Sequence, residues 1–296
     1  MLLIGPPGSG KTMLANCLSS IMPAMSKEES YEVTKIYSIA GHLTRKSGLI
    51  QDRPFRAPHH TITQAALAGG GSQNPRPGEC SFAHAGILFL DEMPEFSRHV
   101  LEVLRQPLES GKVTIGRVKQ VYSYPAQFLL VGSMNPCLCG YYGTRDQQQC
   151  TCSPAQVQRY RSRISGPLLD RIDIHLEVPR VPVEILGKRA EEEASGVIKK
   201  RVEIARISQR ERLTMNKEFP YNSRMGSADI RKHIQLDREG QALLKLAFET
   251  MGLSARAYDR ILKVARTIAD LAGSKRVEST HISEAIRYRS LDRSVI

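Results

Sequence analysis

Short apolar runs alternate with glycine-rich and polar segments over the first 180 residues of the chain. Apolar runs of about four to eight residues are typical of buried strands in a parallel sheet, because helices cover both faces of such a sheet. The runs that lead into Asp91 and Asn135 are of this kind. Strands of an α/β core are therefore predicted over 2–4, 33–40, 87–90, 128–131 and 172–178.

Beyond Pro179 and Pro182 the pattern becomes helical. A long and strongly charged helix is predicted over 183–213. Residues that cap helix N-termini recur in the rest of the chain. Three further helices are predicted, with N-caps or first residues at Asp237, Ser254 and Thr280 and with ends near residues 251, 272 and 288.

The chain is thus expected to form an α/β core over residues 1–180 and a separate helical domain over residues 181–296. Within the core, a stretch rich in Gly, Pro and His with little periodicity is typical of a functional insertion. The core is predicted to contain this insertion at 41–86, a β-hairpin at 112–124 and a cysteine-rich loop at 137–152.

The composition is that of an ordinary globular protein, with 296 residues and a formal net charge of +12. Such a basic balance favours a polyanionic partner, nucleic acid first, although a solvated basic surface without a partner explains the charge about equally well. No apolar run is long enough to span a membrane, and Met1 leads directly into a glycine-rich loop, which excludes a signal peptide. We therefore expect a cytoplasmic protein with no membrane partner.

The residues after the first apolar run fit the phosphate-loop pattern G-x-x-x-x-G-K-[ST] at every fixed position. Glycines let successive backbone N–H groups turn toward phosphate oxygens, and the start of the next helix adds its positive dipole end. A chance turn of Gly and Pro is disfavoured because a strand precedes the loop and a helix follows it. The residues predicted to bind the nucleotide are Gly5, Pro6, Pro7, Gly8, Ser9, Gly10, Lys11, Thr12 and Met13.

Polar residues at the ends of two other predicted strands complete a site for ATP and Mg²⁺. Lys11 suits the β and γ phosphates, and the Thr12 hydroxyl suits Mg²⁺. Asp91 suits the same ion, and Glu92 can polarise the attacking water. Asn135 can hydrogen-bond both water and the γ-phosphate. A plain strand followed by an acidic helix start is less plausible at 87–92, given the loop upstream.

Two C-x-C pairs follow Asn135: Cys137 with Cys139, and Cys150 with Cys152. Paired thiols in a cytosolic protein suggest Zn²⁺ before disulfides. Four sulfur ligands would hold together a loop that has few apolar residues of its own. The C-x-C spacing fits less well than the common C-x₂-C, but a structural zinc site remains the favoured interpretation.

Other potential ligand residues are given a structural role. His59 and His60 could bind a metal, but adjacent residues face different ways on any regular element, so packing or contact is favoured. Cys17 and Cys80 are predicted to be ordinary buried thiols.

The predicted hairpin carries the residue types that contact nucleic acid. Lys112, Arg117 and Lys119 are basic, and Tyr122 and Tyr124 are aromatic. Such residues bind phosphates and stack on bases. Taken alone, the hairpin is interpreted as a solvated edge.

Together these motifs resemble the AAA+ ATPases, and more narrowly the magnesium-chelatase-like YifB/ComM family of bacteria. The resemblance covers nearly the whole chain and rests on several separate blocks in the same order. These are RPFRAPHH at 53–60, GGG at 69–71, PGE at 77–79, AHAG at 83–86 leading into FLDE, MNPCLC at 134–139 followed by GYYG, and SGPLLDRID at 165–173.

The resemblance implies an AAA+ P-loop core with a C-terminal helical lid, and it assigns further roles. Lys11 and Thr12 match Walker A, Asp91 and Glu92 match Walker B, and Asn135 matches sensor 1.

Three arginines and the hairpin also receive roles from the family. Arg171 matches the arginine finger that reaches the neighbouring subunit, with Arg163 as the second choice. Arg256 matches the lid arginine called sensor 2, and a cation in a first helical turn is disfavoured by the dipole, which suggests that it faces a ligand. The 113–124 hairpin matches the pre-sensor hairpin, which favours its contact with DNA.

The family is associated with ATP-driven DNA branch migration during natural transformation. The chain is therefore expected to act, in its full-length form, as a homo-hexameric motor on branched or single-stranded DNA. The family's N-terminal Lon-protease-like domain and the upstream part of the adenine pocket are missing, so the chain is expected to be truncated and to bind nucleotide or assemble less well. Two other functions stay open: the motor subunit of a chelatase that inserts metal into a tetrapyrrole, and a zinc-stabilised DNA-binding fragment without catalysis.

Overall fold

The computed structural model describes residues 1–43, 48–71, 74–116, 120–144, 148–181, 192–213, 220–289 and 291. These residues form two compact units. Unit 1 takes in most of the first 181 residues. Unit 2 takes in residues from 192 onward, together with the short segments Ser20–Pro23 and Asp173–Leu176. None of the described helices is both long and apolar enough to cross a membrane.

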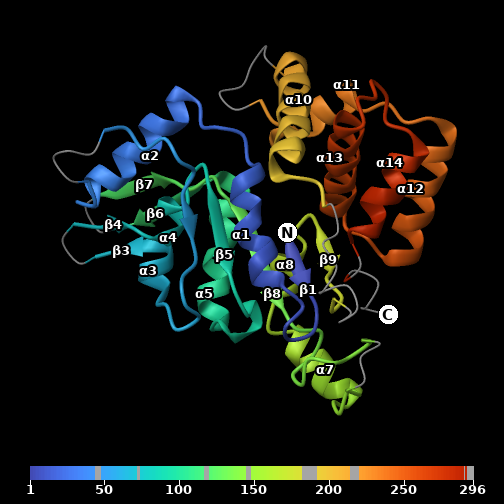
Figure 1. Cartoon of the computed structure of the whole chain (residues 1–296), viewed down its shortest axis with the longest axis horizontal. Coiled ribbons are helices and arrows are strands. Elements are labelled where there is room, and N and C mark those ends of the chain that lie inside the picture. The colour runs from blue at the N-terminus through green and yellow to red at the C-terminus, as the bar shows by residue number, and fades with distance from the viewer. Residues whose placement is uncertain are drawn as a thin grey trace. The chain divides into compact units, whose positions relative to one another are not determined.

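A parallel five-stranded sheet forms the centre of unit 1 (Figure 1). Its central strands β1 (Leu2–Ile4), β5 (Ile87–Leu90) and β8 (Leu129–Met134) consist mainly of apolar residues, and β1 and β5 are buried along their whole length. The predicted strands near residues 2, 88, 129 and 174 are confirmed. The strand order is β2 (Phe55–Arg56), β5 (Ile87–Leu90), β8 (Leu129–Met134), β1 (Leu2–Ile4) and β9 (His175–Glu177).

The strand predicted over 33–40 is wrong, because these residues belong to helix α2 (Lys27–Ile39). Its β-branched residues favour a strand locally, but Val33 and Ile36 recur at a helical spacing and are both buried. Ser26 and Glu29 form a capping box at the helix start, and this signal outweighs the strand propensity. The missing sheet strand is β2, which comes from the segment predicted to be an insertion.

The remaining elements of unit 1 are short. Two antiparallel pairs, β3 with β4 and β6 with β7, stand apart from the main sheet (Figure 1), and the second is the predicted hairpin. The elements are α1 (Lys11–Ile21), α3 (Gln64–Ala68), β3 (Gly69–Gly70), β4 (Arg76–Pro77), α4 (Glu79–Phe82), the 3-10 helix Met93–Glu95, α5 (Arg98–Val103), α6 (Arg105–Ser110), β6 (Lys112–Gly116), β7 (Val121–Pro125), α7 (Pro154–Arg161) and α8 (Gly166–Leu169).

Unit 2 is helical, as predicted. Asp237 and Ser254 cap α12 and α13 through their side chains, and α11 was not predicted. Of the helix predicted over 183–213, residues 183–191 lie outside the described residues. The elements are α10 (Ser195–Leu213), the 3-10 helix Asn222–Arg224, α11 (Ser227–His233), α12 (Arg238–Met251), α13 (Ala255–Leu271) and α14 (Ser279–Arg287).

A buried polar network fastens α13 inside unit 2. Asp270 accepts hydrogen bonds from Arg212 at 3.0 Å, from Arg266 at 3.1 Å and from Asn222 at 2.8 Å. The Arg266 side chain is almost fully buried and also donates to the carbonyl of Lys275. One carboxylate thus neutralises two guanidinium groups that have little access to water.

We predict that Asp270→Asn lowers the free energy of unfolding of unit 2 by about 3–5 kcal/mol, because it leaves two largely buried cations without a counter-charge. Urea unfolding followed by circular dichroism measures this change. Glu249→Gln is the control, since Glu249 pairs only loosely with Lys245, at 3.9 Å, and both side chains are exposed. Equal unfolding curves for the two variants would contradict the prediction.

Candidate functional site

Three strand ends meet at one edge of the main sheet. Ile4, the last residue of β1, pairs with Met134 of β8. Leu90, the last residue of β5, pairs with Gly132, which also belongs to β8. The phosphate loop, the two acids and Asn135 therefore follow neighbouring parallel strands, at the position where open α/β sheets bind ligands.

The loop after β1 has a backbone that side chains would obstruct. A Cβ atom at Gly5 would lie 2.1 Å from the carbonyl oxygen of Val178, and Gly8 adopts a φ of 76°. The Ser9 hydroxyl is buried and has no hydrogen-bond partner within the described part of the chain. A tight glycine cradle with an unsatisfied hydroxyl fits a phosphate group, which offers acceptor oxygens on all sides.

Lys11 lies across this loop. Its ammonium group donates to the carbonyls of Gly5 at 2.7 Å and Pro6 at 2.9 Å, and to Oδ1 of Asn135 at 3.2 Å. Burial lowers the pKa of Lys11, while the nearby charges of Asp91 and Glu92 act in the opposite direction. The ammonium can exchange these oxygens for those of a phosphate without leaving the site.

The acid at the end of β5 contacts the hydroxyl at the start of α1. Thr12 Oγ1 donates to Oδ2 of Asp91 at 2.9 Å. A hydroxyl and a carboxylate at this distance are oxygen ligands of the kind that Mg²⁺ uses beside phosphates. The site therefore fits a Mg²⁺–nucleotide, with Thr12 and Asp91 as the residues that would hold the ion.

Ser133 is a site residue that the sequence analysis missed. Its hydroxyl donates to Oδ1 of Asp91 and accepts the backbone N–H of Glu92 at 3.0 Å. Glu92 adopts a left-handed φ of 52°, which is uncommon for a residue other than glycine. The sequence offered one signal for this role: Ser133 lies only two residues before Asn135, at the end of the predicted strand that leads into that site residue.

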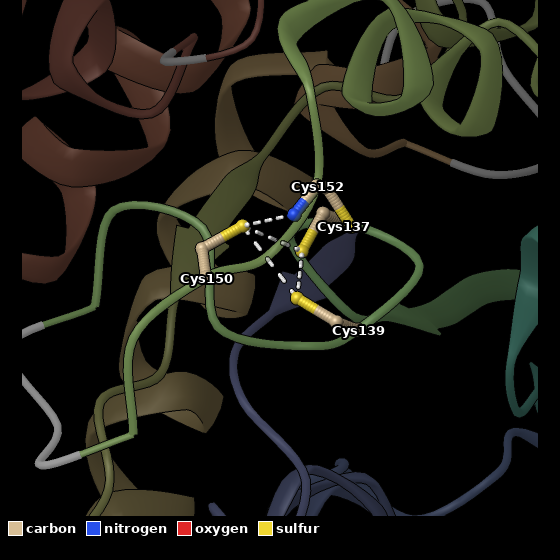
Figure 2. Close-up of side chains that lie close together, drawn as sticks. All are labelled: Cys137, Cys139, Cys150 and Cys152. Carbon is tan, nitrogen blue, oxygen red and sulfur yellow. Dashed lines mark hydrogen bonds between the residues drawn. The ribbon is translucent and has the colours of Figure 1, made fainter.

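The four predicted ligand cysteines come together (Figure 2). Their sulfur atoms all lie within 4.8 Å of one another, and three of the Sγ–Sγ distances are 3.3, 3.5 and 3.7 Å. Tetrahedral zinc with Zn–S bonds of about 2.3 Å requires sulfurs roughly 3.8 Å apart. The cluster of Cys137, Cys139, Cys150 and Cys152 therefore fits zinc.

The other cysteines and the paired histidines have no such arrangement in the described residues. Cys80 is buried as predicted, and burial raises the pKa of its thiol to about 12. Cys17 is exposed, so its predicted burial is wrong: α1 buries only Ala15 among its residues. The rings of His59 and His60 stack with centroids 4.0 Å apart.

The arginines assigned by resemblance differ in exposure. Arg171 is buried, and its guanidinium donates to Glu109 at 2.6 Å and to the carbonyl of Pro167 at 2.7 Å. Arg163 is half-exposed and pairs with Glu95 at 2.7 Å. Arg256 belongs to α13 of unit 2.

The residues in the described part of the hairpin differ in exposure. Lys112 is exposed at the base of β6. The predicted contacts Arg117 and Lys119 lie outside the described residues. Tyr124 is buried, and its hydroxyl donates to the carbonyl of Pro75 at 2.6 Å, so it supports the fold rather than stacking on a base.

A phosphate loop beside an acid-tipped strand, in a five-stranded parallel core with a C-terminal helical unit, defines a P-loop protein of the AAA+ class. Residues 1–186 match the family model described as magnesium chelatase, subunit ChlI, and residues 192–289 match the model of its C-terminal part. The chain belongs to this magnesium-chelatase family.

Relatives of known sequence refine this placement. The chain is 44% identical over its full length to the uncharacterised protein YifB of Salmonella typhimurium and 43% identical over 99% of its length to the competence protein ComM of Haemophilus influenzae. It is 24% identical over 46% of its length to the magnesium-chelatase 38 kDa subunit of Rhodobacter capsulatus, of which it covers 43%. The chain spans 57% of YifB and 56% of ComM, so it matches about half of each.

We predict that Ser133→Ala lowers the free energy of unfolding of unit 1 by about 1–3 kcal/mol, because it removes a buried hydroxyl that has two partners. Urea unfolding measures the change. Ser81→Ala is the matched control, since Ser81 is equally buried and its hydroxyl has no partner among the described residues. A loss as large in Ser81→Ala as in Ser133→Ala would contradict this role.

Proposed function

We propose that the chain is a Mg²⁺-dependent ATPase. The observation that carries the proposal is the convergence of Lys11 with Asn135 and of Thr12 with Asp91 across three strand ends. Lys11 would neutralise the β and γ phosphates, and Glu92 would orient the attacking water. Mg²⁺, when bound, supplies charge neutralisation at the same phosphates.

Further groups would complete the site in an assembly of identical subunits. We propose a homo-hexamer in which Arg171 acts on the nucleotide of the neighbouring subunit after exchanging Glu109 for phosphate. Arg163, which is already half-exposed, is the second candidate. Arg256 would act from the helical unit as sensor 2. Membership of the magnesium-chelatase family and the likeness to the competence protein support such an assembly.

Zinc bound by the four cysteines would hold the loop between them. The loop is rich in Gly, Thr and Gln and offers few apolar side chains, so it cannot be stabilised by burial alone. The closeness of the four sulfur atoms, all within 4.8 Å of one another, supports this proposal.

The proposed client is DNA, branched or single-stranded, acted on in the cytoplasm as a branch-migration motor of recombination during natural transformation. The net charge of +12, the exposed Lys112 and the likeness to a competence protein support it. The second candidate is the motor subunit of a metal chelatase, which the family's description favours. The magnesium-chelatase subunits of Rhodobacter capsulatus and Chlamydomonas reinhardtii are only 24% and 25% identical to the chain, against 43% for the competence protein, so DNA is the stronger candidate.

We predict that Glu92→Gln lowers ATP turnover by about 10²-fold or more while nucleotide binding is kept, because only the base is lost. Lys11→Ala should abolish binding of the nucleotide. Phosphate release and binding of a fluorescent ATP analogue measure the two effects, with Glu249→Gln as the control on an exposed acid of unit 2. If Glu92→Gln left ATP turnover unchanged, this site would not be the one that hydrolyses ATP.

We predict that a four-way DNA junction binds the chain at low salt and raises its ATP turnover. Lys112→Ala should weaken binding of every DNA sequence and reduce the slope of log affinity against log salt by about 1, because a phosphate contact is lost. Lys245→Ala is the matched control on an exposed lysine of unit 2. Absence of both binding and stimulation, with ATP turnover intact, would reject the DNA motor and leave the chelatase function.

A further inference from the structure

The cysteine loop, defined as residues 137–152, begins two residues after a group of the nucleotide site. Asn135 accepts a hydrogen bond from Lys11 at 3.2 Å. Pro136 and Cys137 follow, and both are buried. The short connection leaves little slack, so the position of Cys137 constrains the position of Asn135 and of the ammonium group that it holds.

A second contact joins the cysteine loop directly to the phosphate loop. A Cβ atom at Gly140 would lie 2.6 Å from Cδ and 2.9 Å from Cγ of Pro7. The Pro7 ring is rigid and cannot rotate away as a flexible side chain would. Gly140 has a φ of 92°, and its N–H donates to the carbonyl of Cys137 at 3.1 Å. The turn between the first two cysteines therefore rests on the phosphate loop.

Several other bonds act within the described part of the cysteine loop, such as the Thr144 hydroxyl on the carbonyl of Tyr141 at 2.9 Å and the N–H of Cys152 on Sγ of Cys150 at 3.4 Å, and these two close only short turns. Arg161 of α7 donates to the carbonyl of Pro136 at 3.2 Å and lies over the ring of Tyr142 at 5.3 Å. The sulfur atoms contact one another, but thiols are weak hydrogen-bond donors and acceptors. A metal bound at the four sulfurs would add the strongest constraint on this loop.

Pro7 stands in the middle of the cradle, between Gly5 and Gly8. The backbone N–H groups that follow it must point toward the phosphates. A small displacement of Pro7 changes the direction of those N–H groups, whereas Gly140 at its present position keeps the ring in place.

We propose that the cysteine cluster braces the phosphate loop, so that zinc bound at Cys137, Cys139, Cys150 and Cys152 sets the affinity of the chain for nucleotide. Zinc would hold Gly140 against Pro7 and Asn135 against Lys11. This inference rests on the proposed nucleotide site and goes beyond it, because it gives the metal a part in binding ATP as well as in stabilising a loop.

Two matched glycine variants test the contact. Gly140→Ala introduces a Cβ into the Pro7 ring, whereas Gly143→Ala introduces one into open space at a similar positive φ of 71°. Both carry comparable backbone strain, so they differ in the contact with Pro7. With zinc content measured in both, Gly140→Ala should weaken binding of a fluorescent ADP analogue about tenfold or more, and Gly143→Ala should leave it unchanged.

Removal of the metal tests the same link without a substitution. The purified chain should contain one zinc per molecule, and a chelator should weaken ADP-analogue binding about tenfold, with recovery when zinc is restored. Circular dichroism during chelation should show that the helical signal is kept, so that loss of binding is not unfolding. This arm decides the matter if Gly140→Ala fails to fold.

The possible failures are distinguishable. If zinc is bound but neither chelation nor Gly140→Ala changes nucleotide affinity, the brace is overturned and the ATPase stands. If no zinc is bound and the nucleotide still binds tightly, the zinc site and the brace fail together while the ATPase stands. If the zinc-loaded chain binds no nucleotide, the proposed ATPase itself is rejected, and the brace with it.

Discussion

The pairing of β8 with both β1 and β5 is the constraint on which the rest of unit 1 depends. Its register places Ser133 opposite Leu3 and Gly132 opposite Leu90. Because side chains alternate across a sheet, a shift of one residue would turn the Ser133 hydroxyl to the other face. Asp91 would then lose a partner, and the Lys11–Asn135 contact would separate. The chemistry of the site is thus fixed by backbone pairing in the core.

Several residues of the family motifs support the fold rather than the chemistry. Arg53 and Glu29 form an ion pair at 2.8 Å with both side chains nearly buried. Arg56 donates two hydrogen bonds to the Glu79 carboxylate, at 2.6 and 2.7 Å. These contacts attach edge strand β2 to α2 and α4, since a two-residue strand has too few ladder bonds to hold itself.

The sequence allowed much of this architecture to be predicted, because apolar runs that end in Asp91 and Asn135 have few alternatives. Helix α2 was missed although its local signals are present in the sequence. The segment 33–40 has strand-forming residues, yet a capping box and two buried residues at helical spacing make it a helix. β2 was missed because two residues carry no periodicity. The roles of Arg117 and Lys119 remain predictions.

Local sequence patterns could not predict contacts between residues that are distant in the chain. Nothing in the sequence near Cys17 shows that α1 buries only Ala15. Likewise, the hydroxyl of Ser133 becomes informative only when its strand is paired with β5. The motif around Arg171 predicted a role for this residue, but its burial against Glu109 depends on a residue 62 positions earlier in the chain.

The Arg171–Glu109 pair would have a consequence for an isolated subunit if Arg171 acts on a neighbouring nucleotide as proposed. The Glu109 carboxylate would then supply the guanidinium with an anion until that nucleotide is bound. An isolated copy would not expose this arginine to free phosphate or sulfate ions. Glu109, with its half-exposed side chain, would serve as a placeholder for the charge that a second copy brings.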